Sequence, residues 1–379
     1  MKRNIGLLFL LLGALPSAST GQLSPAAADR IDRLAAGARE RLDLPGLSVA
    51  VVVDGQLAHE RGFGLADVEQ GVTASAATVY PIASITKSVT AVAAFQLVDE
   101  GRLELDAPVQ RWVPSFPEAS APMTMRHLLW HTSGIRHYRT EANDDAEYAN
   151  RTHYPSLEAA VGAFARDSLM HPPGAGVTYS SFAYTLAGRV LEVAAGASFM
   201  EVVQSRILEP AAMRHTRAHD PRAIVPLRAR GYVRVDGELR NAEFVDPSNR
   251  LPGGGLLSTV GDLARFASAL MDGRLLSPAA FDAMTDSLRI GGGAHPLAAG
   301  WAIGTGNWLP ERAPFANVLW NGGNIHGATS VLYLVPERRF AVVVATNVQD
   351  HGTDMLRLAD DIARAALGAP EITSSAGAP

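Results

Sequence analysis

The stretch YPIASITKSVTAVAAFQLVDEG occupies residues 80–101, and the rest of the chain can be placed around it. From Ser84 to Glu100 nearly every position is apolar or small, and Gly101 follows as a helix stop signal. A helix that is apolar on all sides is buried inside a protein rather than lying on its surface. The stretch therefore predicts a central helix with other elements packed around it.

Strands are predicted near both ends of the chain, where apolar and β-branched residues run together between turn residues. They are expected at 47–53, 56–65, 301–304, 317–320, 330–335 and 340–346, with helices at 26–43, 259–272 and 352–367. Residues 102–250 are predicted to be mostly helix and loop, with helices near 124–131, 156–166, 182–195 and 199–208. This order predicts an α/β fold in which both chain ends build one sheet, with flanking helices and a mostly helical insertion at about 102–250.

The N-terminus has the pattern of a secretory signal peptide, which we expect to cover residues 1–20. Lys2 and Arg3 precede an apolar run, and small residues at 17–19 suit cleavage near Ser19 or Thr20. The alternative interpretation of residues 1–20 is a membrane anchor. We therefore expect a secreted or periplasmic protein whose main domain covers 21–369, followed by a disordered tail at 370–379. The absence of cysteine excludes disulfides and thiolate metal sites.

Composition narrows the possible partners. The net charge of the chain is −5, and removing Lys2 and Arg3 with the leader makes it −7. Basic residues are scattered, so nucleic-acid binding has little support, and no apolar run beyond the N-terminus is long enough to span a membrane. The 11 histidines lack metal-ligand spacing. We expect no metal, and a small-molecule or peptide substrate as the partner; the oligomeric state stays open.

The rarity of lysine in this chain points to a candidate catalytic residue. The chain has only two lysines, Lys2 and Lys87, so its other 31 basic residues are arginines. Lys87 follows Ser84 by three positions, which places both side chains on one face of the helix start. Burial there disfavours the ammonium form, so the amine can accept the serine proton, and arginine cannot because it stays protonated. A surface lysine beside a helix-capping serine is the plain alternative.

Two further segments could complete such a site. Tyr179 lies just before a predicted helix, and a tyrosine between a cationic lysine and a serine could have its pKa lowered and relay a proton. The stretch LWNGGNIHGATSVLYLVP has glycines that let a substrate approach a strand edge closely. A backbone N–H there could form an oxyanion hole with that of Ser84. The alternative interpretation of each segment, considered by itself, is that Tyr179 is a packing residue and that the Gly-Gly-Asn stretch is a turn.

In this order the three segments resemble those of the penicillin-binding protein and serine beta-lactamase superfamily. The chain is similar to the class C beta-lactamase, D,D-peptidase and esterase branch, and more closely to the mitochondrial serine beta-lactamase-like proteins and their bacterial relatives. Five segments carry the resemblance: YPIASITKSVTA, LLWHTSGIRHY, YSSFAYTLAGRVLEVAAG, PGGGLLSTVGDLARF and GATSVLYLVP. The resemblance implies the beta-lactamase/transpeptidase-like fold with an antiparallel sheet. It also implies an acyl-enzyme at Ser84, with Lys87 as proton acceptor and Tyr179 as second base, and no cofactor.

Two positions depart from the family pattern. Its tyrosine motif is usually Tyr-x-Asn, and here Ser181 stands third, as a small hydroxyl residue does in the mitochondrial-type relatives. Its strand motif usually begins with Lys or His and then Thr/Ser-Gly, and here the residues are Asn321, Gly322 and Gly323, followed by Asn324. Ser181, Asn321, Gly323 and Asn324 are the expected substrate-binding residues. Because the cation that meets a substrate carboxylate is missing, little preference for that carboxylate is expected.

These observations predict an exported serine hydrolase that acts on peptide amide or ester bonds, with a peptidase-like role. The enzymatic alternatives are a D,D-carboxypeptidase, an esterase or a weak beta-lactamase. A non-catalytic binding or assembly protein of the same fold is the alternative from another class, which the altered strand motif favours and the retained Lys87 opposes.

Overall fold

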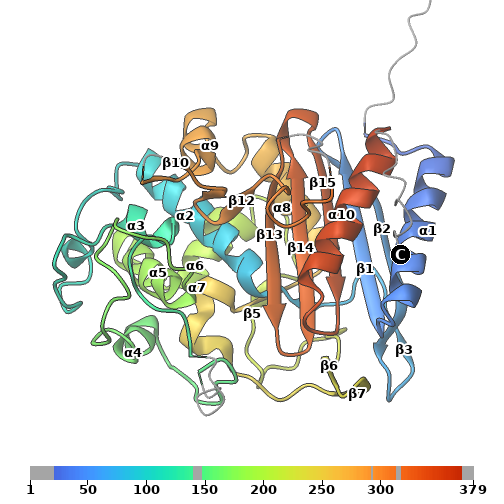
Figure 1. Cartoon of the computed structure of the whole chain (residues 1–379), viewed down its shortest axis with the longest axis horizontal. Helices are drawn as coiled ribbons and strands as arrows, with labels where there is room; N and C mark the ends of the chain where they lie inside the picture. Colours follow the sequence, from blue (N-terminus) through green and yellow to red (C-terminus); the bar gives the residue numbers. More distant parts are fainter. Residues whose placement is uncertain (1–20, 140–146, 292, 313–316, 369–379) are drawn as a thin grey trace, which may run out of the picture.

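The computed structural model describes residues 21–139, 147–291, 293–312 and 317–368. The predicted signal peptide and the whole of the predicted tail lie outside these residues. Among them, no helix is long and apolar enough to cross a membrane. Figure 1 shows a large sheet beside a region built mostly from helices.

An eight-stranded antiparallel sheet forms one half of the molecule, and both ends of the chain contribute to it. In spatial order its strands are β11 (Leu297–Ala298), β12 (Trp301–Ile303), β13 (Leu319–Ile325), β14 (Ala328–Val335), β15 (Phe340–Thr346), β1 (Gly46–Val53), β2 (Gln56–Asp67) and β3 (Val72–Thr73). The junction is the pairing of β1 with β15, in which Leu47 lies opposite Thr346. The sheet built from both termini is confirmed.

Helices cover both faces of this sheet. They are α1 (Pro25–Arg41) and α10 (Gly352–Leu367) on one face, and α8 (Val260–Met271) with α2 (Thr86–Asp99) on the other. Side chains alternate between the faces of a strand, so Val49 and Val51 of β1 pack in the core beneath α1 and α10, whereas Ala50 and Val52 join the core beneath α8. Apart from Ser48, β1 has no polar side chain, because both its faces are buried.

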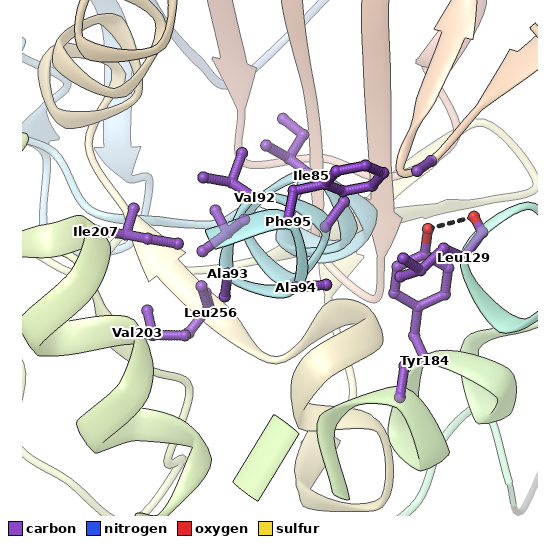
Figure 2. Close-up of a cluster of buried hydrophobic side chains, with 14 of the residues drawn as sticks. Ile85, Val92, Ala93, Ala94, Phe95, Leu129, Tyr184, Val203, Ile207 and Leu256 are labelled. Carbon is purple, nitrogen blue, oxygen red and sulfur yellow. Dashed lines mark hydrogen bonds between the residues drawn. The ribbon is translucent and has the colours of Figure 1, made fainter. Parts of the chain in front are cut away.

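Helix α2 lies between the sheet and the helical region and is buried on nearly every side. Figure 2 shows Val92, Ala93 and Phe95 of α2 surrounded by side chains from other elements. Ile207 and Val203 come from the helical region, and Tyr184 donates a hydrogen bond to the carbonyl of Leu129 beside it (2.7 Å). The prediction of a central buried helix is confirmed. Its first turn differs, because residues Ala83–Ile85 form the short 3-10 helix η1 and α2 begins at Thr86.

The remaining region contains short helices and small strand pairs. Its helical elements are η2 (Val109–Arg111), α3 (Met125–Leu129), α4 (Leu157–Gly162), α5 (Ser181–Ala195), α6 (Phe199–Val203), η3 (Gln204–Leu208), η4 (Pro247–Arg250), α7 (Leu251–Gly254) and α9 (Pro278–Thr285), and η5 (Pro336–Arg338) joins β14 to β15. Its strands are β4 (Tyr80–Pro81), β5 (Arg217–Ala218), β6 (Tyr232–Val235), β7 (Glu238–Asn241), β8 (Leu256–Ser258), β9 (Arg289–Ile290) and β10 (Gly293–Ala294). The predicted helices near 124–131, 156–166 and 199–208 are shorter or broken into two pieces.

One strand was predicted with the wrong bounds, and several short strands were missed. The strand expected at 317–320 continues to Ile325, because backbone pairing with β14 extends through the two glycines to the Ile325–Ala328 pair. Glycine has a low intrinsic strand preference, so its pairing is decided by the neighbouring strand. The β6–β7 hairpin and the β4–β8–β5 sheet were missed because their strands are only two to four residues long. The helix expected at 259–272 is confirmed as α8, with the Thr259 hydroxyl accepting from the Asp262 amide.

Candidate active site

Ser84 and Lys87 lie where η1 meets α2. Ala83 precedes the serine with φ +43°, a left-handed conformation that L-residues seldom adopt, and the chain turns there from β4 into the helix. The Lys87 ammonium nitrogen Nζ lies 3.0 Å from Ser84 Oγ. The two residues predicted from their spacing are therefore brought into direct contact.

Lys87 is 1 % exposed, and its Nζ contacts three oxygen atoms. Besides Ser84 Oγ, these are Ser181 Oγ at 2.9 Å and the Gly253 carbonyl oxygen at 2.5 Å. Burial, and secondarily the positive charge of Arg250, hold the pKa of Lys87 well below its ordinary value. A neutral amine donates two hydrogen bonds and accepts one. The Gly253 carbonyl can only accept, so the lone pair is left for a hydroxyl proton, as the proton transfer from Ser84 requires.

Tyr179 approaches the serine from the other side. Its hydroxyl donates to Ser84 Oγ at 2.6 Å, and its ring lies 4.7 Å from Lys87 Nζ. The expected lowering of its pKa was wrong: burial raises the pKa of Tyr179, and the neighbouring Tyr138 adds to this. The reason is that Lys87, being buried, is not the cation that would have stabilised a phenolate.

Two neutral histidines support this tyrosine. The His131 and Tyr179 ring centres are 4.4 Å apart, and those of His137 and Tyr179 are 5.3 Å apart. His131 Nδ1 accepts from the Ser180 backbone amide, and His137 Nδ1 accepts from that of Ser181, each at 3.1 Å. Burial lowers the pKa of His131 well below its usual range and that of His137 to about 3, so both rings are neutral acceptors at neutral pH. They fix the start of α5, and with it Tyr179.

Of the four expected substrate-binding residues, Ser181 and Asn321 contact the protein itself. Ser181 is fully buried, with its hydroxyl beside Lys87. The Asn321 side-chain nitrogen donates to Ser84 O (3.0 Å), Ser88 Oγ (3.1 Å) and Gly300 O (2.9 Å). Its two amide hydrogens are therefore already engaged by three protein oxygens. These contacts join β13 to the segment that carries Ser84. A direct contact of Ser181 or Asn321 with substrate remains a prediction.

Gly323 and Asn324 lie further along β13. A Cβ atom on Gly323 would come within 2.1 Å of the Ile82 carbonyl oxygen, so only glycine lets β13 approach η1 this closely. The Asn324 side chain donates to Asp350 (2.7 Å) and accepts from its backbone amide (3.0 Å). Asn324 also lines both cavities described next. Its contact with substrate stays a prediction, as does that of Gly323.

Two cavities lie at this site, one at Ser84 and one at its contact residues Lys87 and Tyr179. One, of about 330 Å³, is lined by Ser84, His137, Tyr138, Tyr148, Tyr179, Gly322 and Asn324. The other, of about 360 Å³, begins at Lys87, His131 and Tyr179 and extends over β13 toward the first turn of α10. Ser84 lines the first of these spaces, and the two spaces share Tyr179 and the stretch of β13 at Gly322 and Asn324.

Arg250 is a residue of this site that the sequence did not suggest. It is 2 % exposed, and its guanidinium lies 4.9 Å from the Tyr138 ring centre and 5.5 Å from that of Tyr148. It donates to the Tyr148 carbonyl at 2.8 Å. It thus holds one cavity wall and places a positive charge near Lys87. Because 31 arginines are scattered along the chain, only its position just before the Pro-Gly-Gly-Gly segment set it apart.

Within the described ranges, no group of three His, Cys, Asp or Glu side chains is arranged to hold a metal ion. What the described site does offer is a serine hydroxyl with two groups within hydrogen-bonding distance of it, an amine with a lowered pKa and a tyrosine hydroxyl. This is the arrangement of an activated nucleophile.

A family model described as Beta-lactamase matches residues 31–367. The chain belongs to the beta-lactamase family. Its fold is the beta-lactamase/transpeptidase fold of that family, as the resemblance implied. Among solved beta-lactamase-like structures, the octameric penicillin-binding protein homologue from Pyrococcus abyssi is 27 % identical with a TM-score of 0.76, over 90 % of this chain and 77 % of that one. The D-amino acid amidase from Ochrobactrum anthropi SV3 (24 % identity, TM-score 0.78, covering 90 % of this chain and 99 % of that one) has the same fold.

Two curated relatives in this beta-lactamase family come from very different organisms. The human mitochondrial serine beta-lactamase-like protein LACTB is 31 % identical over 62 % of this chain and 55 % of its own length. Protein flp of Staphylococcus aureus strain MW2 is 27 % identical over 80 % of this chain and 60 % of its own length. The chain thus spans little more than half the length of the curated relatives it matches.

Proposed function

We propose that this member of the beta-lactamase family is an exported serine hydrolase that forms an acyl-enzyme at Ser84 on peptide amide or ester bonds. The observation that carries the proposal is the pair of contacts on Ser84 Oγ, from Lys87 Nζ at 3.0 Å and from the Tyr179 hydroxyl at 2.6 Å, with the pKa of Lys87 held low by burial. Export rests on residues 1–20 of the sequence alone.

In the proposed reaction, Ser84 Oγ bonds to the substrate carbonyl carbon while its proton passes to the free amine of Lys87. Backbone N–H groups at Ser84 and on β13 stabilise the oxyanion. When the tetrahedral intermediate collapses, the bond to the leaving group breaks. The leaving group takes a proton from Tyr179, which regains one from the Lys87 ammonium. Water then attacks the acyl ester, gives up a proton to the same groups and releases the acid, restoring Ser84.

The test is intact-mass analysis after treatment with a fluorophosphonate, which needs an activated serine and no particular substrate. We expect one adduct on the parent protein, none on Ser84→Ala and at least a hundredfold slower labelling of Lys87→Arg, since arginine cannot take the serine proton. Absence of the adduct, under conditions that label an active relative, would favour the non-catalytic alternative. The mass of the protein recovered from outside the cytoplasm reports the cleavage near residue 20.

The enzymatic alternatives separate by their need for a substrate carboxylate. The amide of Asn321 is engaged by Ser84, Ser88 and Gly300, and it stands where the family usually has a cation. We therefore expect less than a threefold difference in kcat/KM between a peptide with a free C-terminal carboxylate and its amide. A strong preference for the carboxylate would favour a D,D-carboxypeptidase.

A further inference from the structure

The larger cavity beside Ser84 is lined chiefly by apolar side chains. Three of the five tryptophans of the chain, Trp301, Trp308 and Trp320, contribute to it, together with Leu297 and Leu356. Its described lining contains no Asp, Glu or Arg, and its only titratable side chains are Lys87, His131 and Tyr179. Burial keeps the pKa of Lys87 and of His131 low. A space of this kind favours an uncharged apolar group over a charged one.

Tryptophan packing shapes the far wall of this cavity. The Trp308 and Trp320 ring centres are 4.8 Å apart with the rings nearly perpendicular (88°), and Trp320 Nε1 donates to the Gly304 carbonyl at 2.9 Å. The Trp320 ring is thus fixed from two sides. Trp308 packs against the core as well as against this ring, but it is only half-buried, so it can be changed with less harm than the buried Trp320.

The cavity is open toward the nucleophile because β13 continues past its neighbour. Strand β12 pairs only with Leu319 and Trp320, and on that side no strand pair continues to Asn321 and the residues after it. The same open stretch, Gly322 to Asn324, lines the space around Lys87 and Tyr179. A substituent next to a carbonyl bound at Ser84 can therefore enter the cavity without crossing a paired strand.

The volume of this cavity suits one group of the size of an aromatic ring. The cavity measures about 360 Å³, at the small end of the range of roughly 300–1,000 Å³ for ligand pockets. An apolar cavity of about 150 Å³ is enough to bind benzene. An aromatic ring with a short linker fits this volume.

We propose that this cavity is a specificity pocket that takes an uncharged aromatic or branched aliphatic group flanking the scissile bond; the inference rests on the proposed function at Ser84. The pocket selects substrates through the buried area and ring contacts of its tryptophans. It rejects the same group when that group carries a carboxylate, because the described lining offers no charged partner.

Two ester pairs test which side of the bond carries the ring. p-Nitrophenyl 3-phenylpropanoate against p-nitrophenyl acetate places it on the acyl side, and phenethyl acetate against ethyl acetate places it on the leaving side. We expect at least a tenfold higher kcat/KM for the ring-bearing member of one pair. A 4-carboxyphenyl version of that member should lose the gain. Equal rates in both pairs would overturn the proposal.

Variants of Trp308 connect the preference to the pocket. In Trp308→Ala we expect the ratio of kcat/KM for the ring-bearing and small esters to fall about tenfold, whereas Trp308→Phe retains most of it. Circular dichroism and the rate of labelling by methyl fluorophosphonate check that the fold and Ser84 are intact. An unchanged ratio in Trp308→Ala would contradict the assignment.

Failure of the proposed function gives a different pattern. If no fluorophosphonate labels Ser84 and no ester is hydrolysed, calorimetric titration of 3-phenylpropanamide against propanamide still tests the pocket. Binding of the ring-bearing amide alone, weakened about tenfold by Trp308→Ala, would support the pocket in a protein without the activity. No binding of either amide would overturn the pocket as well.

Discussion

At the scale of single residues, Lys87 shows why an amine is kept in a protein that otherwise uses arginine. Its Nζ is buried among Ser84, Ser181 and the Gly253 carbonyl, with no carboxylate among the contacts found for it. Such a group exchanges protons because desolvation disfavours its charged form, whereas a guanidinium stays charged even when buried. Arg250 is an example of a buried guanidinium that stays charged, beside two tyrosine rings and carbonyl oxygens.

The lowered pKa of Lys87 predicts a pH dependence for acylation. Above that pKa the amine is free to take the serine proton, and below it the ammonium cannot. The rate of Ser84 labelling should therefore rise with pH through a midpoint below the ordinary lysine value of about 10.4 and then level off. The labelling rate is measured at each pH from 5 to 10 by quenching samples at set times and determining their intact mass. The rate of the Lys87→Arg variant should not rise with pH in this way. A flat profile in the parent would contradict the role of the free amine.

At the scale of elements, the site depends on how closely β13 approaches η1. The Ser330 hydroxyl of β14 donates to the Ile82 carbonyl at 3.3 Å, and Asn321 of β13 donates to the Ser84 carbonyl. Gly323 has no side chain to hold the strand away. The edge of the sheet and the start of α2 are in this way positioned as one unit around Ser84.

Adding a methyl group at Gly323 should separate these two elements. In Gly323→Ala the new Cβ would overlap the Ile82 carbonyl oxygen (2.1 Å) and Ser330 Oγ (2.7 Å). We expect the free energy of unfolding to fall by about 1–3 kcal/mol and Ser84 labelling to slow by about a hundredfold. Gly322→Ala is the matched control, since its Cβ would meet a Trp320 ring atom at 3.3 Å. Equal stability of the two variants in urea would show that the close approach does not matter.

At the scale of the whole molecule, the two ends of the chain close one sheet and cover the same face of it. Helices α1 and α10 pack in a single core with β1, β14 and β15. The buried Asp360 of α10 accepts hydrogen bonds from Tyr333 (2.9 Å), Arg312 (2.7 Å) and Arg364 (2.8 Å). These bonds offset the free-energy cost of burying a carboxylate. The last helix is thus part of the scaffold that positions β13.

Shortening Ile362 tests how much stability α10 contributes. Its side chain is fully buried in the core shared with α1. We expect Ile362→Ala to lower the free energy of unfolding by about 2–5 kcal/mol and Ile362→Val by about 0.5–1.5 kcal/mol, because the first leaves a larger cavity. Urea unfolding followed by tryptophan fluorescence measures both. A loss below 1 kcal/mol for Ile362→Ala would mean that this end of the chain adds little to the fold.

The sequence by itself determined the central helix, the strands at both ends and the Ser84–Lys87 pair, because each depends on local periodicity or on a three-residue spacing within one helix. It also gave the tyrosine motif and the departures at Ser181 and Asn321, as residue identities without contacts.

Only the tertiary structure decided how these parts act together. The sign of the Tyr179 pKa shift, the Gly253 carbonyl on Lys87 and the three acceptors of Asn321 all depend on residues distant in sequence. The strand pairing of the two glycines depends on β14, and the tryptophan-lined cavity depends on where β12 stops pairing with β13. Desolvation and strand pairing are properties of packed neighbours, so no local pattern in the chain could specify them.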